Sequence, residues 1–139
     1  MFNRYVAASL CTLALCVSGC GPTKSAPSVR ISGTVTLDGK PLETGQISFI
    51  PTDGKGNSAG AAVNDGSFDA EVFPGAMRVE IIAPKVTGTR KVYDTPDSPS
   101  EDVTEEQIPS RYNVNSTLTL DAALGEDRSD LQFALTSAN

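Results

Sequence analysis

The feature that most constrains the fold of this chain is a set of short segments in which apolar and polar residues alternate. In the first segment, Val29, Ile31, Val35 and Leu37 are separated by polar or small residues. Such a period of two places the apolar side chains on one face of a β-strand. Because no stretch keeps a helical period, we predict an all-β fold, a single seven-stranded β-sandwich with Greek-key connections. The six further segments are residues 45–51, 59–63, 68–72, 79–83, 118–122 and 131–135.

Turn-forming residues separate these segments. Asp38-Gly39 followed by Pro41 ends the first, and Phe73-Pro74-Gly75 ends the fourth. Asp65-Gly66 predicts a two-residue hairpin turn, because both positions tolerate a positive φ. The alternating segments and their turns predict one domain over residues 29–137.

The amino-terminal 20 residues have the order of an export signal. Arg4 supplies positive charge, an apolar stretch runs from Tyr5 to Val17, and Val17-Ser18-Gly19-Cys20 follows. The apolar stretch is shorter than the roughly 20 residues that a membrane-spanning helix needs. Its end resembles the lipobox of bacterial lipoprotein signals, which implies cleavage between Gly19 and Cys20 and acylation of Cys20, with palmitate among the acyl chains. An ordinary secretory signal or an uncleaved anchor is the alternative.

Cleavage at this position divides the chain into three parts. Residues 1–19 form the signal peptide. Its cleavage removes Cys11 and Cys16, so the mature domain has neither a free thiol nor a disulfide. Residues 20–28 form the lipidated cysteine and a flexible tether rich in Pro, Ser and Gly. Each buried methylene of an acyl chain contributes on the order of 0.8 kcal/mol. We therefore expect an exported protein, lipid-anchored to a bacterial cell membrane and facing the periplasm or the cell exterior.

The composition limits the chemistry that the chain can perform. The 139 residues include no histidine, and 11 basic against 17 acidic residues give a net charge of -6. Without histidine there is no Ser-His-Asp triad and no imidazole metal ligand. A negative surface disfavours nucleic acid, whose binding depends on cations that neutralise phosphates. We expect no catalytic residues, no cofactor, no metal, no nucleic acid and no small-molecule substrate.

One long segment, residues 85–115, shows no strand pattern and is expected to form a long loop. Its first part is basic, and its second part contains six carboxylates. These carboxylates offer oxygen ligands to Ca²⁺, but their spacing matches no EF-hand, and a solvated acidic loop is the alternative. Thr104-Glu105-Glu106-Gln107 has the pattern of a capping box that opens a helical turn. Because long loops are often functional, the residues expected to meet a partner are Tyr93, Asp94, Asp97, Glu101, Asp102, Glu105, Glu106 and Tyr112, with Tyr112 also expected to pin the loop to the domain.

Four segments of the domain resemble a known family. The segment from Ile31 to Leu42, with Gly33, Val35, Gly39 and Pro41-Leu42, resembles the opening of transthyretin-like (prealbumin-like), carboxypeptidase regulatory-like domains. Residues 46–51 are similar to their second strand, and residues 68–81 are similar to their middle part. Residues 108–119 resemble small bacterial lipoproteins built on this domain. The resemblance implies a β-sandwich and is only weakly specific for function.

The function expected from these features is that of a non-catalytic, membrane-anchored lipoprotein of the cell envelope, with a structural or interaction role. Its partner is an unidentified envelope protein or glycan. The alternative is an accessory module that binds carbohydrate or peptide, in a groove lined by Tyr93, by Tyr112 or by a sheet edge. A third hypothesis is a hydrolase of the transthyretin-like class. The resemblance implies histidines and a carboxyl-terminal Tyr-Arg-Gly-Ser for that activity, whereas this chain has no histidine and ends Ser137-Ala138-Asn139.

Overall fold

The protein is all-β, and its computed structural model describes residues 26–138. The predicted signal peptide, the predicted cleavage position at Gly19 and Cys20, and most of the predicted tether lie outside the described residues. A single 3₁₀ turn, η1 (Ser110–Tyr112), interrupts the strands. The strands are β1 (Val29–Leu37), β2 (Lys40–Pro41), β3 (Thr44–Pro51), β4 (Ala59–Asn64), β5 (Ser67–Val72), β6 (Gly75–Ile82), β7 (Pro84–Lys91), β8 (Ser100–Glu106), β9 (Thr119–Ala122) and β10 (Arg128–Leu135).

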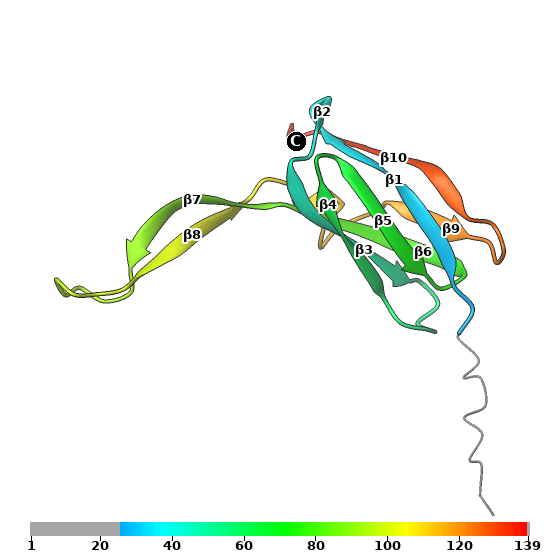
Figure 1. Cartoon of the computed structure of the whole chain (residues 1–139), viewed down its shortest axis with the longest axis horizontal. Coiled ribbons are helices and arrows are strands. Elements are labelled where there is room, and N and C mark those ends of the chain that lie inside the picture. Colours follow the sequence, from blue (N-terminus) through cyan, green and yellow to red (C-terminus); the bar gives the residue numbers. More distant parts are fainter. Residues whose placement is uncertain (1–25, 139) are drawn as a thin grey trace, which may run out of the picture.

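Eight of the strands form one curled sheet, the body of the molecule (Figure 1). The order across it is β10-β1-β5-β4-β3-β6-β9, and β2 pairs with the end of β1. β1 and β10 run parallel, whereas the other neighbours are antiparallel. β4 and β5 pair at Asn64 and Ser67, beside their connecting turn. The remaining strands, β7 and β8, form a separate two-stranded sheet that projects from the body.

The curled sheet encloses one hydrophobic core. In β5 the buried residues Phe68, Ala70 and Val72 alternate with exposed ones, as a period of two requires. Phe68 also links distant strands, because its ring centroid lies 6.0 Å from that of Phe49 on β3 and 5.9 Å from that of Phe133 on β10. Each of the seven segments predicted from the alternation overlaps one strand of the body.

The turn between β4 and β5 confirms the predicted hairpin signal. Asp65 and Gly66 have φ angles of 47° and 77°. Asp38 and Gly39, between β1 and β2, have φ angles of 51° and 76°. Two consecutive positive φ angles are typical of a type I′ turn, which matches the twist of the strands it joins.

The expectation of an irregular loop over residues 85–115 is wrong. Most of this segment forms the β7–β8 hairpin, and Thr104 to Glu106 belong to β8 rather than to a helical turn. The segment shows no period of two because both faces of the hairpin are exposed to solvent. A strand with two solvated faces has no reason to alternate apolar with polar residues.

Candidate functional site

The hairpin, called the arm below, comprises residues 84–106 and extends away from the body (Figure 1). All eight residues of β7 are exposed, and in β8 only Val103 is half-buried. The arm carries three of the six large apolar residues that are most exposed in the described chain, namely Val86, Val92 and Tyr93. An element that contributes so little to the core is well suited to contact another molecule.

Charge is divided between the two strands of the arm. β7 contains Lys85, Arg90 and Lys91 and no carboxylate, whereas β8 contains four carboxylates and no basic residue. Arg90 lies opposite Glu101, and its Nε donates to Glu101 Oε1 over 2.5 Å. Lys85 lies opposite Glu105. Opposite charges across a strand pair hold the hairpin together without a core of its own.

The tip of the arm, residues 92–99, is held by hydrogen bonds. The Tyr93 backbone N–H donates to Ser98 Oγ over 2.7 Å, and the Val92 N–H donates to the Pro99 carbonyl over 2.9 Å. Lys91 Nζ reaches the Thr95 carbonyl at 3.3 Å. Tyr93 is 65% exposed, so its ring is presented to solvent by an ordered turn.

The base of the arm is fixed to the body by Glu106. Its Oε1 accepts hydrogen bonds from the backbone N–H groups of Ala83 and Ile108, both over 2.8 Å. Gln107 donates from its side chain to the Ala83 carbonyl at 3.1 Å. Ala83 and Ile108 are buried in the core. Glu106 therefore positions the arm, and the partner contact expected for it from the sequence stays a prediction.

Tyr112 lies on the body and not with Tyr93. The Arg111 guanidinium stacks 4.7 Å from the centroid of its ring, and its hydroxyl lies 3.4 Å from Thr136 Oγ1. The hydrogen bond with Thr136, followed by that with Arg111, lowers the pKa of the Tyr112 hydroxyl. Tyr112 is partly buried against the hydrophobic core and so pins the segment that follows the arm, as expected. Tyr93 and Tyr112 thus line no common groove.

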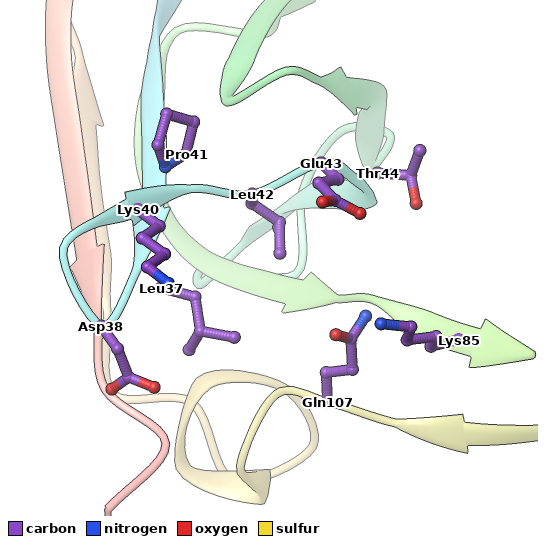
Figure 2. Close-up of a pocket in the computed structure, with 9 residues that line it drawn as sticks. All are labelled: Leu37, Asp38, Lys40, Pro41, Leu42, Glu43, Thr44, Lys85 and Gln107. Carbon is purple, nitrogen blue, oxygen red and sulfur yellow. The ribbon is translucent and has the colours of Figure 1, made fainter. Parts of the chain in front are cut away.

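A cleft of about 420 Å³ opens where the arm meets the body (Figure 2). Lys85 and Gln107 line it from the arm side, and Leu37 and Lys40 line it from the β1–β2 turn. The lining thus contains two amines, from Lys40 and Lys85, and two carboxylates, from Asp38 and Glu43. Mixed charge in an open cleft offers polar contacts to a docked chain but no concentrated charge for a small ion.

The remaining predicted residues lie along the arm. Asp94 and Asp97 belong to the tip, and Glu101, Asp102 and Glu105 belong to β8. Within residues 26–138, no three of these or other Asp and Glu side chains gather closely enough to hold a metal ion.

Several structural contacts involve residues that the sequence did not single out. Ser137 donates from its backbone N–H and its Oγ to the two oxygens of Asp38, at 2.9 and 2.6 Å. Arg111 donates to the Thr136 and Ala138 carbonyls. These contacts join residues about 25 to 100 positions apart, so no local sequence pattern predicts them.

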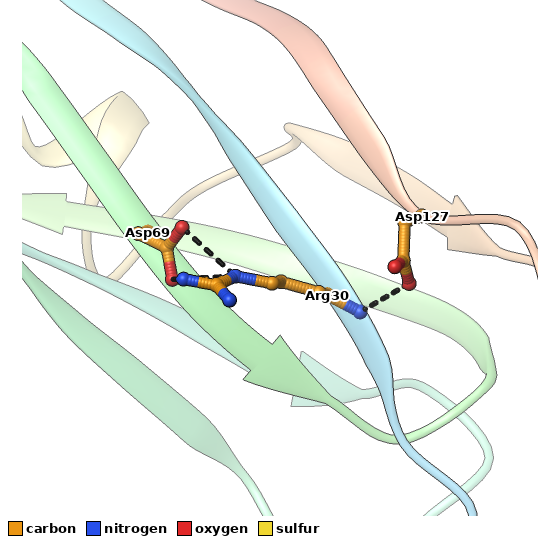
Figure 3. Close-up of polar contacts among 3 residues, drawn as sticks. All are labelled: Arg30, Asp69 and Asp127. Carbon is orange, nitrogen blue, oxygen red and sulfur yellow. Dashed lines mark hydrogen bonds and ion pairs between the residues drawn. The ribbon is translucent and has the colours of Figure 1, made fainter.

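At the opposite end of the body, Arg30 fixes the start of β1 (Figure 3). Its backbone N–H donates to Asp127 Oδ1 over 3.0 Å, and its guanidinium pairs with Asp69 at 3.1 Å. The side-chain hydrogen bond with Asp69 raises the pKa of the Arg30 guanidinium. The strand that follows the amino-terminal segment is thereby held on both of its edges.

In the part of the chain that the structure describes, no helix is long and apolar enough to cross a membrane.

Comparison with known proteins yields little. No protein-family model and no curated protein matches the chain. Among solved structures it is similar to a 9R-lipoxygenase from Cyanothece PCC8801, with 13% sequence identity and a TM-score of 0.42. The match covers 84% of this chain and 18% of the lipoxygenase chain, so this chain spans less than a fifth of that protein's length. A similarity at this TM-score carries no argument about fold or function.

Proposed function

We propose that this protein is a non-catalytic, lipid-anchored component of a bacterial cell envelope whose body holds the arm out toward a partner. Cys20 carries the lipid, residues 21–28 form the tether, and the arm is the docking element. The observation that carries the proposal is the arm itself, an ordered hairpin whose residues are almost all exposed.

The position of the arm relative to Val29 supports this arrangement. Val29 pairs with Val72, close to the turn that enters β6, whereas the arm leaves from the other end of β6 after Ile82. The eight residues of β6 separate these ends by roughly 25 Å. A membrane anchor attached through residues 20–28 would therefore leave the arm on the far side of the body (Figure 1).

In this proposal the body, counted without the two-residue strand β2, is a seven-stranded β-sandwich of the transthyretin-like, carboxypeptidase regulatory-like type. The residues that carry the resemblance support it by their positions. Val35 and Leu42 are buried, and Gly39 has a positive φ in the turn between them. Such sandwiches host many roles, so the fold by itself names no partner.

The anchor is tested by labelling cells with radioactive palmitate. Wild-type protein should incorporate label and stay with the membrane fraction after a high-salt wash, because acyl chains bind by burying methylenes and not by charge. The Cys20→Ser variant should lose the label and leave the membrane. Cys16→Ser is the matched control and should behave as wild type. Unlabelled wild-type protein, or a labelled Cys20→Ser variant, would refute the anchor.

The docking role is tested by placing a photo-crosslinking phenylalanine analogue at Tyr93 in intact cells. We expect a defined adduct from this position, whereas the same analogue at Leu124, equally exposed on the body at 65%, should give none. Adducts of equal yield at both positions would show random collision and would contradict the proposal. Peptidoglycan pull-down that is lost on Tyr93→Ala would instead identify the partner as a glycan.

A further inference from the structure

The arm has two unpaired edges. β7 and β8 pair with each other, and within residues 26–138 neither outer edge pairs with another strand. An isolated two-stranded hairpin is only marginally stable in water, and further strands stabilise it. The arm is thus both a structure that gains stability from added strands and a surface that offers backbone hydrogen bonds to them.

The charges of the arm decide which strands it accepts. β7 carries three cations, and β8 carries four carboxylates. If two copies paired symmetrically, β7 would meet β7 or β8 would meet β8, and like charges would face each other. Like charges opposite one another destabilise a strand pair, whereas opposite charges stabilise it. The pairing that satisfies the charges is that of β7 from one copy with β8 from another.

We propose that the partner of the arm is a second copy of this chain, and that β7 of one copy pairs edge to edge with β8 of its neighbour. This inference rests on the proposed role of the arm as a docking element and names its partner. The two strands match in length, with eight and seven residues. Their uncharged centres, around Gly88 and Val103, lie opposite each other within one arm. In the proposed pairing, the centre of β7 in one copy also lies beside the centre of β8 in its neighbour.

Pairing of this kind is heterologous, because the two copies contribute different surfaces. A pair of arms leaves one β7 edge and one β8 edge free, so a third copy can add by the same contact. The expected assemblies are therefore chains or closed rings of copies at the membrane, and not an isolated symmetric dimer.

The experiment uses two full-length variants, Gly88→Cys and Val103→Cys, expressed together with different carboxyl-terminal tags. A side chain at Gly88 meets open space, and Val103 is only half-buried, so both substitutions preserve the arm. Each position is at the middle of its strand, so the two sulfurs come close whichever way neighbouring arms point. Mild oxidation of intact membranes should join Gly88→Cys to Val103→Cys at least about tenfold more than either variant to itself.

Two controls separate this contact from random collision and from a general effect of net charge. Leu124→Cys, on an exposed loop of the body, should cross-link at background level. Lys85→Glu with Lys91→Glu, added to the Gly88→Cys copy, should reduce the mixed disulfide about tenfold. The matched body substitution Lys40→Glu should leave it unchanged. Equal yields of mixed and self disulfides, or a mixed disulfide that is insensitive to the two β7 substitutions, would overturn the proposal.

Different experimental outcomes would refute the proposed function and this inference. If the arm forms adducts with other envelope molecules from position 93 while the two cysteine variants do not join, the docking role stands and self-pairing is wrong. If the mixed disulfide forms in cells but Cys20 carries no lipid, self-pairing stands and the anchor is wrong.

Discussion

At the scale of single residues, Asp38 joins the β1–β2 turn to the carboxyl-terminal segment. Its carboxylate accepts the Oγ and the backbone N–H of Ser137, and these hydrogen bonds lower the pKa of Asp38. A lowered pKa in the folded state means that the ionised form is the one that holds the contact. The contact therefore contributes stability above the ordinary pKa of aspartate, about 4, and loses it as the pH falls through the lowered value.

We predict that this contact opens in acid. The protection factor of the Ser137 N–H, which is the exchange rate of an unstructured peptide divided by the rate measured by NMR at the same pH, should be high at about pH 6 and low at about pH 2–3. In Asp38→Asn the protection factor should be lower at the higher pH, and its pH dependence in this range should disappear, because the side-chain amide does not ionise. An Asp38→Asn variant that keeps the wild-type acid dependence would show that another group controls the segment.

Gly33 is the second residue with a specific physical role. A Cβ added there would lie 2.1 Å from the backbone oxygen of Leu131 on β10. The close approach of β1 to β10 explains why glycine stands at a position that the family resemblance also marks. This contact could not be predicted from the sequence, because the two strands are almost 100 residues apart and pair in parallel.

We predict that Gly33→Ala destabilises the protein by about 1–3 kcal/mol, since backbone atoms must move to admit the methyl group. Gly88→Ala on the arm is the matched control, because an added Cβ there meets open space. Urea denaturation of both variants measures the difference. Equal urea midpoints for the two variants would mean that β10 moves aside for the methyl group without loss of stability.

At the scale of elements, sequence reasoning succeeded where one face of a strand is buried and failed where none is. The seven body strands were predictable because Val29 to Leu37 and its counterparts must alternate to face one core. The arm was missed because nothing in it faces a core, and its pairing depends on opposite charges, such as Arg90 and Glu101, on two separate strands. The grouping of acidic residues was visible in the sequence, but the role of each was not. Glu105 lies on the exposed arm, whereas its neighbour Glu106 fixes the base.

We predict that Glu106→Ala loosens the arm at its base. The variant leaves the N–H groups of Ala83 and Ile108 without their acceptor, which should lower the free energy of local opening by about 1–3 kcal/mol. Hydrogen exchange at these two amides should accelerate accordingly, while exchange in β1 and β5 stays unchanged. Glu106→Gln keeps a side-chain oxygen and should retain most of the protection. Unchanged exchange in Glu106→Ala would mean that other contacts hold the arm.

At the scale of the whole molecule, stability and interaction are separated in space. All buried apolar side chains of the described chain lie outside residues 84–106. The free energy of unfolding of the body is therefore expected to be independent of the arm, so that substitutions in the arm should not destabilise the body. The arm, which carries the proposed contact, also lies far from the start of β1, the first strand of the described chain (Figure 1).

We predict that the body folds without the arm. Replacing residues 85–105 by Asn-Gly joins Pro84 to Glu106, which are paired in the hairpin, through a two-residue turn. The base contacts of Glu106 remain, so the thermal midpoint of the shortened protein should stay within about 4 °C of wild type, a change of less than about 1 kcal/mol. Ile81→Ala, in the core, should by contrast lose about 2–5 kcal/mol.

Calorimetry compares the two variants, and membrane fractionation and cross-linking follow the shortened one. Retained membrane attachment with lost assembly is the expected result, because the proposed anchor precedes β1 and the arm leaves the other end of the body. A body that unfolds without its arm would show that the hairpin supports the fold.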